Sequence, residues 1–294
     1  HVMVQKPWVV SSILLPKKIS NEWNGNVTVG GNVMEHGSEA DSWKTSVVVN
    51  GPIIQDKLGI QLRGSYLDRQ KSERIPETSG RDPRPSEADT YDVGGKLAFN
   101  LNDQNTFWID GFHSSQTYKN DDNRLGTLDT PARANGYKDE LEFKRDQISA
   151  GHDGDYSFGK WTSYISQTQT ETIGRTIPRN TFPGNVAAGQ DRTLKNTDFV
   201  ADSHVVLPIA DHKLTVGAEY KEAEIADDIA GIGAKFKKDS FSVYAEDEWR
   251  ILDNLGFTLG GRYEDHSGFG GQFSPRAYLV WNTNDHLTFK GGVS

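Results

Sequence analysis

The sequence predicts an all-β protein, an antiparallel transmembrane β-barrel, and three observations lead to that fold class. Apolar and polar residues alternate with a two-residue period in several segments. The connections between these segments are alternately short and long. Most tryptophans lie beside the short connections. These features are typical of strands that face lipid on one side and a polar lumen on the other.

The alternation is clearest in residues 91–101, where Val93 and Leu97 share one face and Asp92 lies on the other. The same period recurs in residues 60–67, 214–221 and 257–264. Residues 107–112 fit less well because, Asp110 apart, both faces are apolar. Asp247 falls on an otherwise apolar face, so we expect either a β-bulge or a position near the membrane boundary there.

The connections fall into two classes. The short class comprises residues 51–57, 102–104, 158–160, 208–212, 253–256 and 282–285. The long, polar class comprises residues 69–90, 117–141, 175–192 and 226–235, with 36–42 and 266–272 as shorter members. This division predicts about 13 strands of roughly 9–11 residues or more, the length of a tilted membrane crossing. Long structureless loops are uncommon inside compact soluble domains, whereas bacterial outer-membrane barrels carry them on one side.

Tryptophan placement gives an independent indication of a membrane boundary. Five of the seven tryptophans lie near a short connection or near the predicted entry to the first strand: Trp23, Trp108, Trp161, Trp249 and Trp281. An indole ring at the lipid–water interface buries its apolar surface and keeps its N–H in contact with water. The alternative is a soluble β-protein with core tryptophans, but core residues have no reason to gather beside one class of turn.

Composition excludes several classes of protein. Hydrophobic residues make up 35% of the chain and mean hydropathy is −0.65, so no run approaches the roughly 20 apolar residues of a membrane-spanning helix. The absence of cysteine excludes thiol catalysis, disulfides and Cys-ligated zinc within this span. The net charge of −9 argues against a nucleic-acid partner and against an anionic-lipid partner.

No catalytic or metal-binding constellation emerges from the residues. The eight histidines are scattered, without the spacing of a zinc site. Residues 121–132 have a glycine at the sixth position of a calcium loop, but Leu125 and Ala132 occupy ligand positions, which excludes an EF-hand. A looser calcium site in that loop stays open as an alternative. We therefore expect no enzyme, no cofactor and no resident metal.

Arginine and aromatic residues are the candidate ligand-binding groups, because they recur in the long loops. The predicted ligand-binding residues are Arg81, Arg84, Arg124, Arg133, Tyr137, Arg175 and Arg179, with Arg69, Arg74, Tyr118 and Phe182 nearby in the sequence. Guanidinium groups pair with anions and stack on rings, and tyrosine offers a flat contact face. The pattern predicts capture of an anionic, aromatic ligand, although charged loops are also common on any outer-membrane protein.

Several motifs resemble those of a known family. Residues 260–265 (GGRYED), 273–281 (FSPRAYLVW) and 287–294 (LTFKGGVS) resemble the mid-barrel signature of TonB-dependent receptors. Residues 49–59 are similar to the first long periplasmic turn of that family, and residues 244–251 (YAEDEWRI) also match it. Within the family the chain is most similar to the colicin I receptor and related catecholate-siderophore receptors.

The resemblance implies a barrel of roughly 22 strands that holds a plug domain, in the bacterial outer membrane. On this basis we expect residues 17–294 to supply the first strands of the barrel, with Lys17 and Lys18 at the plug–barrel junction and no plug present. Residues 1–16 do not match the family and are expected to be an out-of-frame stretch or a plug remnant. The chain is thus expected to be cut at both ends.

The resemblance also implies a function and partners. The implied function is TonB-dependent uptake of a ferric siderophore, of catecholate type. The implied partners are that chelate, TonB through the plug, outer-membrane lipid and lipopolysaccharide, and a colicin or phage. A passive porin, a bacteriocin or phage attachment barrel and a soluble β-rich binding module are the alternatives. A plug-coding region upstream would separate a receptor from a porin.

Overall fold

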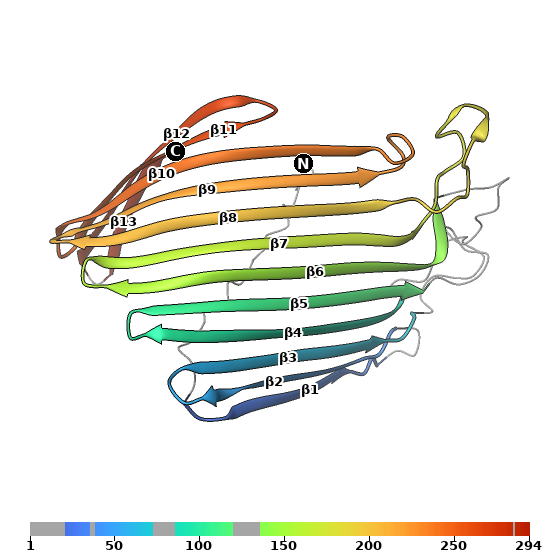
Figure 1. Cartoon of the computed structure of the whole chain (residues 1–294), viewed down its shortest axis with the longest axis horizontal. Coiled ribbons are helices and arrows are strands. Elements are labelled where there is room, and N and C mark those ends of the chain that lie inside the picture. The colour runs from blue at the N-terminus through green and yellow to red at the C-terminus, as the bar shows by residue number, and fades with distance from the viewer. Residues whose placement is uncertain (1–20, 36–38, 73–85, 120–135, 285) are drawn as a thin grey trace.

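The computed structural model describes residues 21–35, 39–72, 86–119, 136–284 and 286–294. In this part of the chain, 13 strands form one antiparallel sheet in which each strand pairs with its neighbours in sequence (Figure 1). The strands are β1 (Asn24–Asn32), β2 (Ser42–Ile54), β3 (Leu58–Arg69), β4 (Glu87–Asn102), β5 (Asn105–Lys119), β6 (Tyr137–Tyr156), β7 (Gly159–Arg175), β8 (Leu194–Ile209), β9 (His212–Asp227), β10 (Lys235–Leu252), β11 (Leu255–His266), β12 (Gly270–Asn284) and β13 (Leu287–Val293). The predicted fold class and strand number are confirmed, whereas residues 1–16 lie outside the described residues.

The sheet is curved, with all the short turns at one end of the strands and the long connections at the other (Figure 1). The turn between β4 and β5 shows how very few residues can reverse the direction of the chain. The Asn102 side-chain oxygen accepts hydrogen bonds from the backbone N–H groups of Gln104, at 3.0 Å, and Asn105, at 2.9 Å. This Asx turn reverses the chain within the two residues that separate the strands. Among the described residues, no helix is long and apolar enough to cross a membrane.

One short connection is narrower than predicted. Residues 51–57 were expected to form it, but β2 continues through Gly51 and Pro52 to Ile54. The pairing of β2 with β3 shifts register between Pro52 and Ile54. A bulge at this point accommodates a proline, which has no N–H to donate to the sheet, so the strand persists almost to the turn.

The two faces of the sheet follow the two-residue period. On β4, Val93, Leu97 and Phe99 are exposed, at 54%, 40% and 43%, on the side that we assign to lipid. Asp92, on the opposite face, accepts a hydrogen bond from Ser65 at 2.8 Å. Apolar side chains left in contact with the surroundings are stable only where those surroundings are hydrocarbon, so the polar face is the lumen side.

The predicted gathering of tryptophans at a membrane boundary beside the short turns is confirmed in part. Trp23, Trp161, Trp249 and Trp281 are 59%, 42%, 41% and 44% exposed and lie at the short-turn end. Trp161 keeps its N–H satisfied by donating to the Ser203 hydroxyl at 3.0 Å. These rings are placed as an interfacial belt requires.

Trp108 does not belong to this belt. It alternates with Phe107 and Ile109, which are 45% and 46% exposed on the lipid side, so its ring points into the lumen. Its N–H donates to Asp153 at 3.0 Å, and the Lys96 ammonium lies 4.3 Å from the ring centroid. This inward ring explains why residues 107–112 are apolar on both faces.

Asp247 lies on the lipid side, paired in register with Leu214 and Leu259. Its Oδ2 is 2.7 Å from Nδ1 of His212, and the His212 ring stacks on Trp249 with centroids 5.3 Å apart. The register shift in β10 comes later, between Arg250 and Leu252, so no bulge reorients Asp247. A partnered carboxylate beside an interfacial tryptophan supports the expected position near the membrane boundary.

Candidate ligand-binding face

The long-loop end holds every predicted ligand-binding residue that the structure describes. Arg81, Arg84, Arg124 and Arg133 lie outside the described residues, as do Arg74 and the calcium-loop-like residues 121–132. Tyr137, Arg175 and Arg179 lie within them, around the start of β6 and the connection from β7 to β8. Among the described residues, no group of three or more His, Cys, Asp or Glu could hold a metal ion.

Tyr137 and Arg175 come together although 38 residues separate them in sequence. They are partners in register, and the Arg175 guanidinium carbon lies 4.0 Å from the centroid of the Tyr137 ring. The pairing of β6 with β7 is irregular between Tyr137 and Glu142, and Gly174 absorbs the distortion with φ of 88°. A side chain at Gly174 would place its Cβ 2.0 Å from the carbonyl oxygen of Glu140, so this position requires glycine.

The Arg175 side chain is held by an aromatic ring in place of a carboxylate. Among the residues that the structure describes, its buried Nε has no hydrogen-bond acceptor and its guanidinium takes part in no ion pair. A guanidinium stacked on tyrosine keeps its charge and most of its donors. The arrangement therefore leaves a cation available to an anionic ligand, beside a flat ring.

Two of the other residues noted in the long loops, Arg69 and Tyr118, also meet, whereas Phe182 precedes the short 3₁₀ turn at residues 183–185. The Arg69 guanidinium lies 5.7 Å from the Tyr118 ring centroid and donates to the backbone oxygen of Ser86 at 3.1 Å. Arg179 is exposed in the β7–β8 connection, four residues beyond Arg175. The structure thus brings together Tyr137 with Arg175, and Arg69 with Tyr118.

The β7–β8 connection, residues 176–193, is a folded unit and not an extended loop. Ile177 exchanges backbone hydrogen bonds with Gln190, at 2.9 Å, and Gly189, at 2.8 Å, and its side chain is 2% exposed. The 3₁₀ turn η2 (Pro183–Asn185) lies at its far end. Such a compact loop fixes the backbone next to Arg175, because the Arg192 N–H donates to the Arg175 carbonyl at 3.0 Å.

A set of side-chain hydrogen bonds, which we call the latch, joins this connection to the β9–β10 connection, residues 228–234. It is made by Arg192 with Asp227 and by Asp228 with two backbone N–H groups. The Arg192 guanidinium forms a bidentate pair with Asp227, with N–O distances of 2.8 and 2.7 Å. The next residue, Asp228, is 7% exposed and accepts backbone N–H bonds from Thr193 at 2.6 Å and Gly233 at 2.8 Å. Each loop thus holds the other through charge-assisted bonds, the stronger kind of hydrogen bond.

Acid is expected to open this latch at Asp228. The N–H groups of Gly233 and Thr193 stabilise the ionised carboxylate and hold the pKa of Asp228 below its ordinary value. Because its pKa is lower in the folded loop than in the unfolded chain, the ionised Asp228 stabilises the folded loop. This stabilisation is complete at pH values above the unfolded-state pKa of about 3.9, and it is lost as the pH falls through the folded-state pKa. Hydrogen exchange at the Gly233 and Thr193 amides, corrected for intrinsic rates, should therefore show protection that falls in acid.

The Asp228→Asn variant is the control for that measurement. Its amide cannot ionise and can accept at only one oxygen, so protection of the Gly233 and Thr193 amides should be lower at neutral pH and independent of pH. A wild-type protein whose protection at these amides stays constant down to about pH 2, below an ordinary carboxyl pKa, would contradict the role of Asp228.

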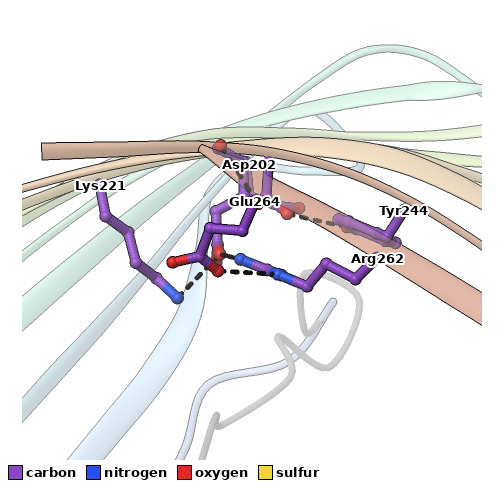
Figure 2. A network of polar contacts seen from close by, with 7 residues as sticks. Asp202, Lys221, Tyr244, Arg262 and Glu264 are labelled. Carbon is purple, nitrogen blue, oxygen red and sulfur yellow. Dashed lines mark hydrogen bonds and ion pairs between the residues drawn. The ribbon is translucent and has the colours of Figure 1, made fainter. Parts of the chain in front are cut away.

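The lumen wall carries a polar network that sequence reasoning did not single out. Figure 2 shows Arg262, on β11, directed toward the carboxylate of Glu264. The Arg262 guanidinium lies 3.2 Å from Glu264 and 2.5 Å from Glu219 on β9, and the Lys221 ammonium is 2.8 Å from the same Glu219 oxygen. Glu219 thus forms ion pairs with two basic side chains, Arg262 and Lys221.

The same network extends through a tyrosine. The Tyr244 hydroxyl donates to Asp202 at 2.9 Å (Figure 2). His204 Nδ1 lies 2.7 Å from the other Asp202 oxygen. Gly217 makes room for this ring, since a Cβ there would lie 2.5 Å from the Tyr244 hydroxyl oxygen. The network presents both signs of charge to whatever fills the lumen.

A sequence signal for this network existed in part. Arg262 and Glu264 share one face of a strand and lie within a motif already quoted. Their partners on β9 could not be identified, because residues that meet across strands are set by register and not by spacing along the chain.

Comparison with known proteins assigns this architecture to a family. A family model described as "TonB dependent receptor-like, beta-barrel" matches residues 82–294. The chain is 27% identical to a probable TonB-dependent siderophore receptor, PirA, of Acinetobacter baumannii, over 96% of this chain and 41% of that protein. It is 24% identical to the ferric enterobactin receptor of Pseudomonas aeruginosa, over 96% of this chain and 42% of that protein.

A solved structure shares the fold. The crystal structure of an R480A mutant of the P. aeruginosa ferric enterobactin receptor, in complex with enterobactin, superposes with a TM-score of 0.76 at 21% identity. The match covers 94% of this chain and 44% of that chain. This chain therefore spans less than half the length of the relatives it matches. Since the family model covers more than two thirds of its residues, the chain belongs to the outer-membrane TonB-dependent receptor β-barrel family.

Proposed function

We propose that the protein takes up a ferric siderophore of catecholate type through the outer membrane, and that the long-loop end binds the chelate first. Family membership supports receptor-mediated uptake, and the named function of the enterobactin receptor supports the catecholate class. We also propose that the protein transports and does not catalyse, in keeping with its relatives, which are named as receptors.

The Tyr137–Arg175 pair is the observation that carries this proposal. A ferric catecholate is anionic and presents flat aromatic rings. Arg175 supplies a positive charge that no carboxylate neutralises among the described residues, and Tyr137 supplies a ring 4.0 Å from that charge. A catecholate ring stacked beside the guanidinium would gain both an ionic and a planar contact. We extend the proposed site to Arg179 and to the predicted residues Arg81, Arg84, Arg124 and Arg133.

The barrel and its partners complete the proposal. Residues 17–294 would form part of the barrel wall, with the polar network around Glu219 facing the lumen. The energy for transport would come from TonB acting on a plug domain. The iron chelate would be the transported substrate and not a cofactor of the protein. Lipopolysaccharide would surround the long-loop end of the wall. A colicin or phage stays a predicted partner that uses the same exterior surface.

Replacing Arg175 by alanine is expected to weaken binding of a ferric catecholate by about tenfold, since a partly desolvated cation–π and ionic contact contributes roughly 1–2 kcal/mol. Arg175→Lys should recover only part of the affinity, because lysine keeps the charge but lacks the planar group. Binding would be measured by tryptophan fluorescence with the ferric complex of a tris-catecholate, using the protein expressed from its own gene.

Arg250→Ala is the matched control. Arg250 lies beside the short turns, 3.0 Å from Asp211 and 64% exposed, so its removal should leave catecholate binding unchanged. Ferric hydroxamate and haem, titrated in parallel, test the ligand class. Equal affinity of the wild-type and Arg175→Ala proteins for the ferric catecholate would remove this pair from the site. Tighter binding of haem or the hydroxamate would overturn the catecholate assignment.

A further inference from the structure

The end of the β7–β8 connection carries two adjacent charged residues that pair in opposite directions. The Asp191 carboxylate lies 2.5 Å from the ammonium of Lys138, the residue after Tyr137 at the start of β6. The Arg192 guanidinium pairs with Asp227 at the end of β9, with N–O distances of 2.8 and 2.7 Å. In the sheet, β7 and β8 lie between β6 and β9 (Figure 1). This segment therefore couples two strands that the sheet itself does not place side by side.

The two ion pairs differ in strength. The Lys138 and Asp191 side chains are 46% and 77% exposed, and an ion pair so open to water contributes little. The Arg192 and Asp227 side chains are 16% and 24% exposed, and two guanidinium nitrogens bind the two carboxylate oxygens. A sheltered bidentate pair of this kind is stronger and fixes the guanidinium in one orientation. Arg192 is therefore the dominant link between the two strands.

Asp227 is a fixed anchor for this link. Its Oδ1 accepts the backbone N–H of Ile229 at 3.0 Å in addition to the bond from Arg192. The next carboxylate, that of Asp228, accepts the backbone N–H of Thr193 at 2.6 Å, directly after Arg192. The β9–β10 connection therefore holds Arg192 through a carboxylate whose own position is set by hydrogen bonds to the backbone.

A backbone path leads from Arg192 to the Tyr137–Arg175 pair. The Arg192 N–H donates to the Arg175 carbonyl at 3.0 Å, and the Thr176 N–H donates to the Gly136 carbonyl at 3.1 Å. The second bond joins the residue directly after Arg175 to the residue directly before Tyr137. Because the buried Nε of Arg175 has no acceptor among the described residues, these backbone bonds decide where the guanidinium lies over the ring. A binding pair keeps its geometry only when surrounding contacts support it in this way.

We propose that Arg192 is a positioning residue for the Tyr137–Arg175 pair, and that the β9–β10 connection sets the affinity of the ligand-binding face through it. The Arg192 charge is already paired with Asp227, whereas the Arg175 guanidinium takes part in no ion pair among the described residues. Arg192 therefore acts on the ligand through the backbone of Arg175 and not by direct contact. This role rests on the proposed function, because its main readout is the affinity for a ferric catecholate.

Single and double variants are compared by tryptophan fluorescence with the ferric complex of a tris-catecholate. Arg192→Ala is expected to weaken binding about fivefold, within the range of coupling that such contact networks carry. Asp227→Asn removes the charge and keeps the shape, so it should also weaken binding and should add little to Arg192→Ala, since both act on the same bond. In the Arg175→Ala background, Arg192→Ala should cause little further loss, because the group that it positions is already absent.

Lys235→Ala is the matched control. Lys235 is a cation at the same end of the sheet, 2.9 Å from Glu224 on β9, and its removal should leave the affinity unchanged. Asp191→Asn, at the exposed pair, should change the affinity by less than about twofold. Equal losses in Arg192→Ala and Lys235→Ala would show that charge, and not position, sets the affinity. That result, wild-type affinity in Arg192→Ala, or full additivity of Arg192→Ala with Arg175→Ala would each overturn the proposal.

Hydrogen exchange at the Thr176 amide separates this role from the uptake function, because it needs no ligand. Exchange should be faster in Arg192→Ala than in the wild-type protein, while both keep the folded, heat-modifiable mobility of the barrel wall in detergent. If the wild-type protein binds no ferric catecholate, the proposed function fails, and the exchange measurement still decides whether Arg192 holds the pair. Unchanged exchange at Thr176 would overturn the positioning role whatever the ligand.

Discussion

Replacing Gly159 by alanine is expected to destabilise the folded barrel wall by about 3 kcal/mol, the scale of a severe backbone clash. Gly159 begins β7 with φ of 147°, and a Cβ there would lie 2.1 Å from the carbonyl oxygen of Val206 on β8. That oxygen belongs to a neighbouring strand, so relief of the clash requires the two strands to separate. The measurement is the fraction of protein that keeps its folded, heat-modifiable mobility in detergent as temperature rises.

Gly111→Ala is the control for that experiment. Gly111 is also a strand glycine, but nothing lies within 4 Å of the position its Cβ would take. Alanine at this site should therefore leave the melting midpoint within a few degrees of wild type, or raise it slightly, because alanine loses less conformational freedom on folding. If the two variants melt together, the close approach of β7 and β8 at Gly159 is not a constraint on the fold.

Removing the Asp110 carboxylate is expected to cost about 2 kcal/mol, because it leaves the Arg63 guanidinium without its partner in the wall of the lumen. The pair is bidentate, with N–O distances of 2.8 and 2.7 Å, and the side chains are 22% and 18% exposed. Asp110→Ala should lower the temperature at which the heat-modifiable form is lost. Arg63→Met/Asp110→Leu should recover most of the loss, since neither charge then remains.

Gly94 provides a second way to disrupt the same pair. Arg63 on β3 reaches Asp110 on β5 by passing over β4 at Gly94, where a Cβ would lie 2.8 Å from the guanidinium carbon. Gly94→Val should therefore mimic Asp110→Ala in the wild-type background. It should add little to the Asp110→Ala variant, because the displaced bond is already absent. Fully additive losses would show that the valine acts by some other route.

The strands and their connections were predictable because the information that specifies them is local. A two-residue period marks β4 in the sequence as clearly as in the structure, where Val93 and Leu97 are exposed and Asp92 faces the lumen. Short turns follow from residues such as Asn102, whose side chain closes its own turn. Neither feature depends on any distant part of the chain.

For the candidate ligand-binding face, the sequence predicted which types of residue it carries but not which of them contact one another. Arginines and tyrosines in the long loops indicated a binding surface, but not that Arg175 would stack on Tyr137 or that Arg192 would join two loops through Asp227. The folded form of residues 176–193 was also missed, because its hydrogen bonds join residues on opposite sides of the loop, as Ile177 and Gln190 do. No period in the sequence reports such pairings.

The sequence by itself determined which residues alternate between lipid and lumen, how many strands form and which ends carry the long loops. Only the tertiary structure decided that Trp108 belongs to the lumen, that Arg63 crosses β4 to Asp110, and that Glu219 binds both Arg262 and Lys221. The sequence does not specify these contacts because they depend on strand register. Alternation assigns a side chain to a face, but its partners on that face depend on how neighbouring strands align, and irregularities such as that between Tyr137 and Glu142 shift the alignment.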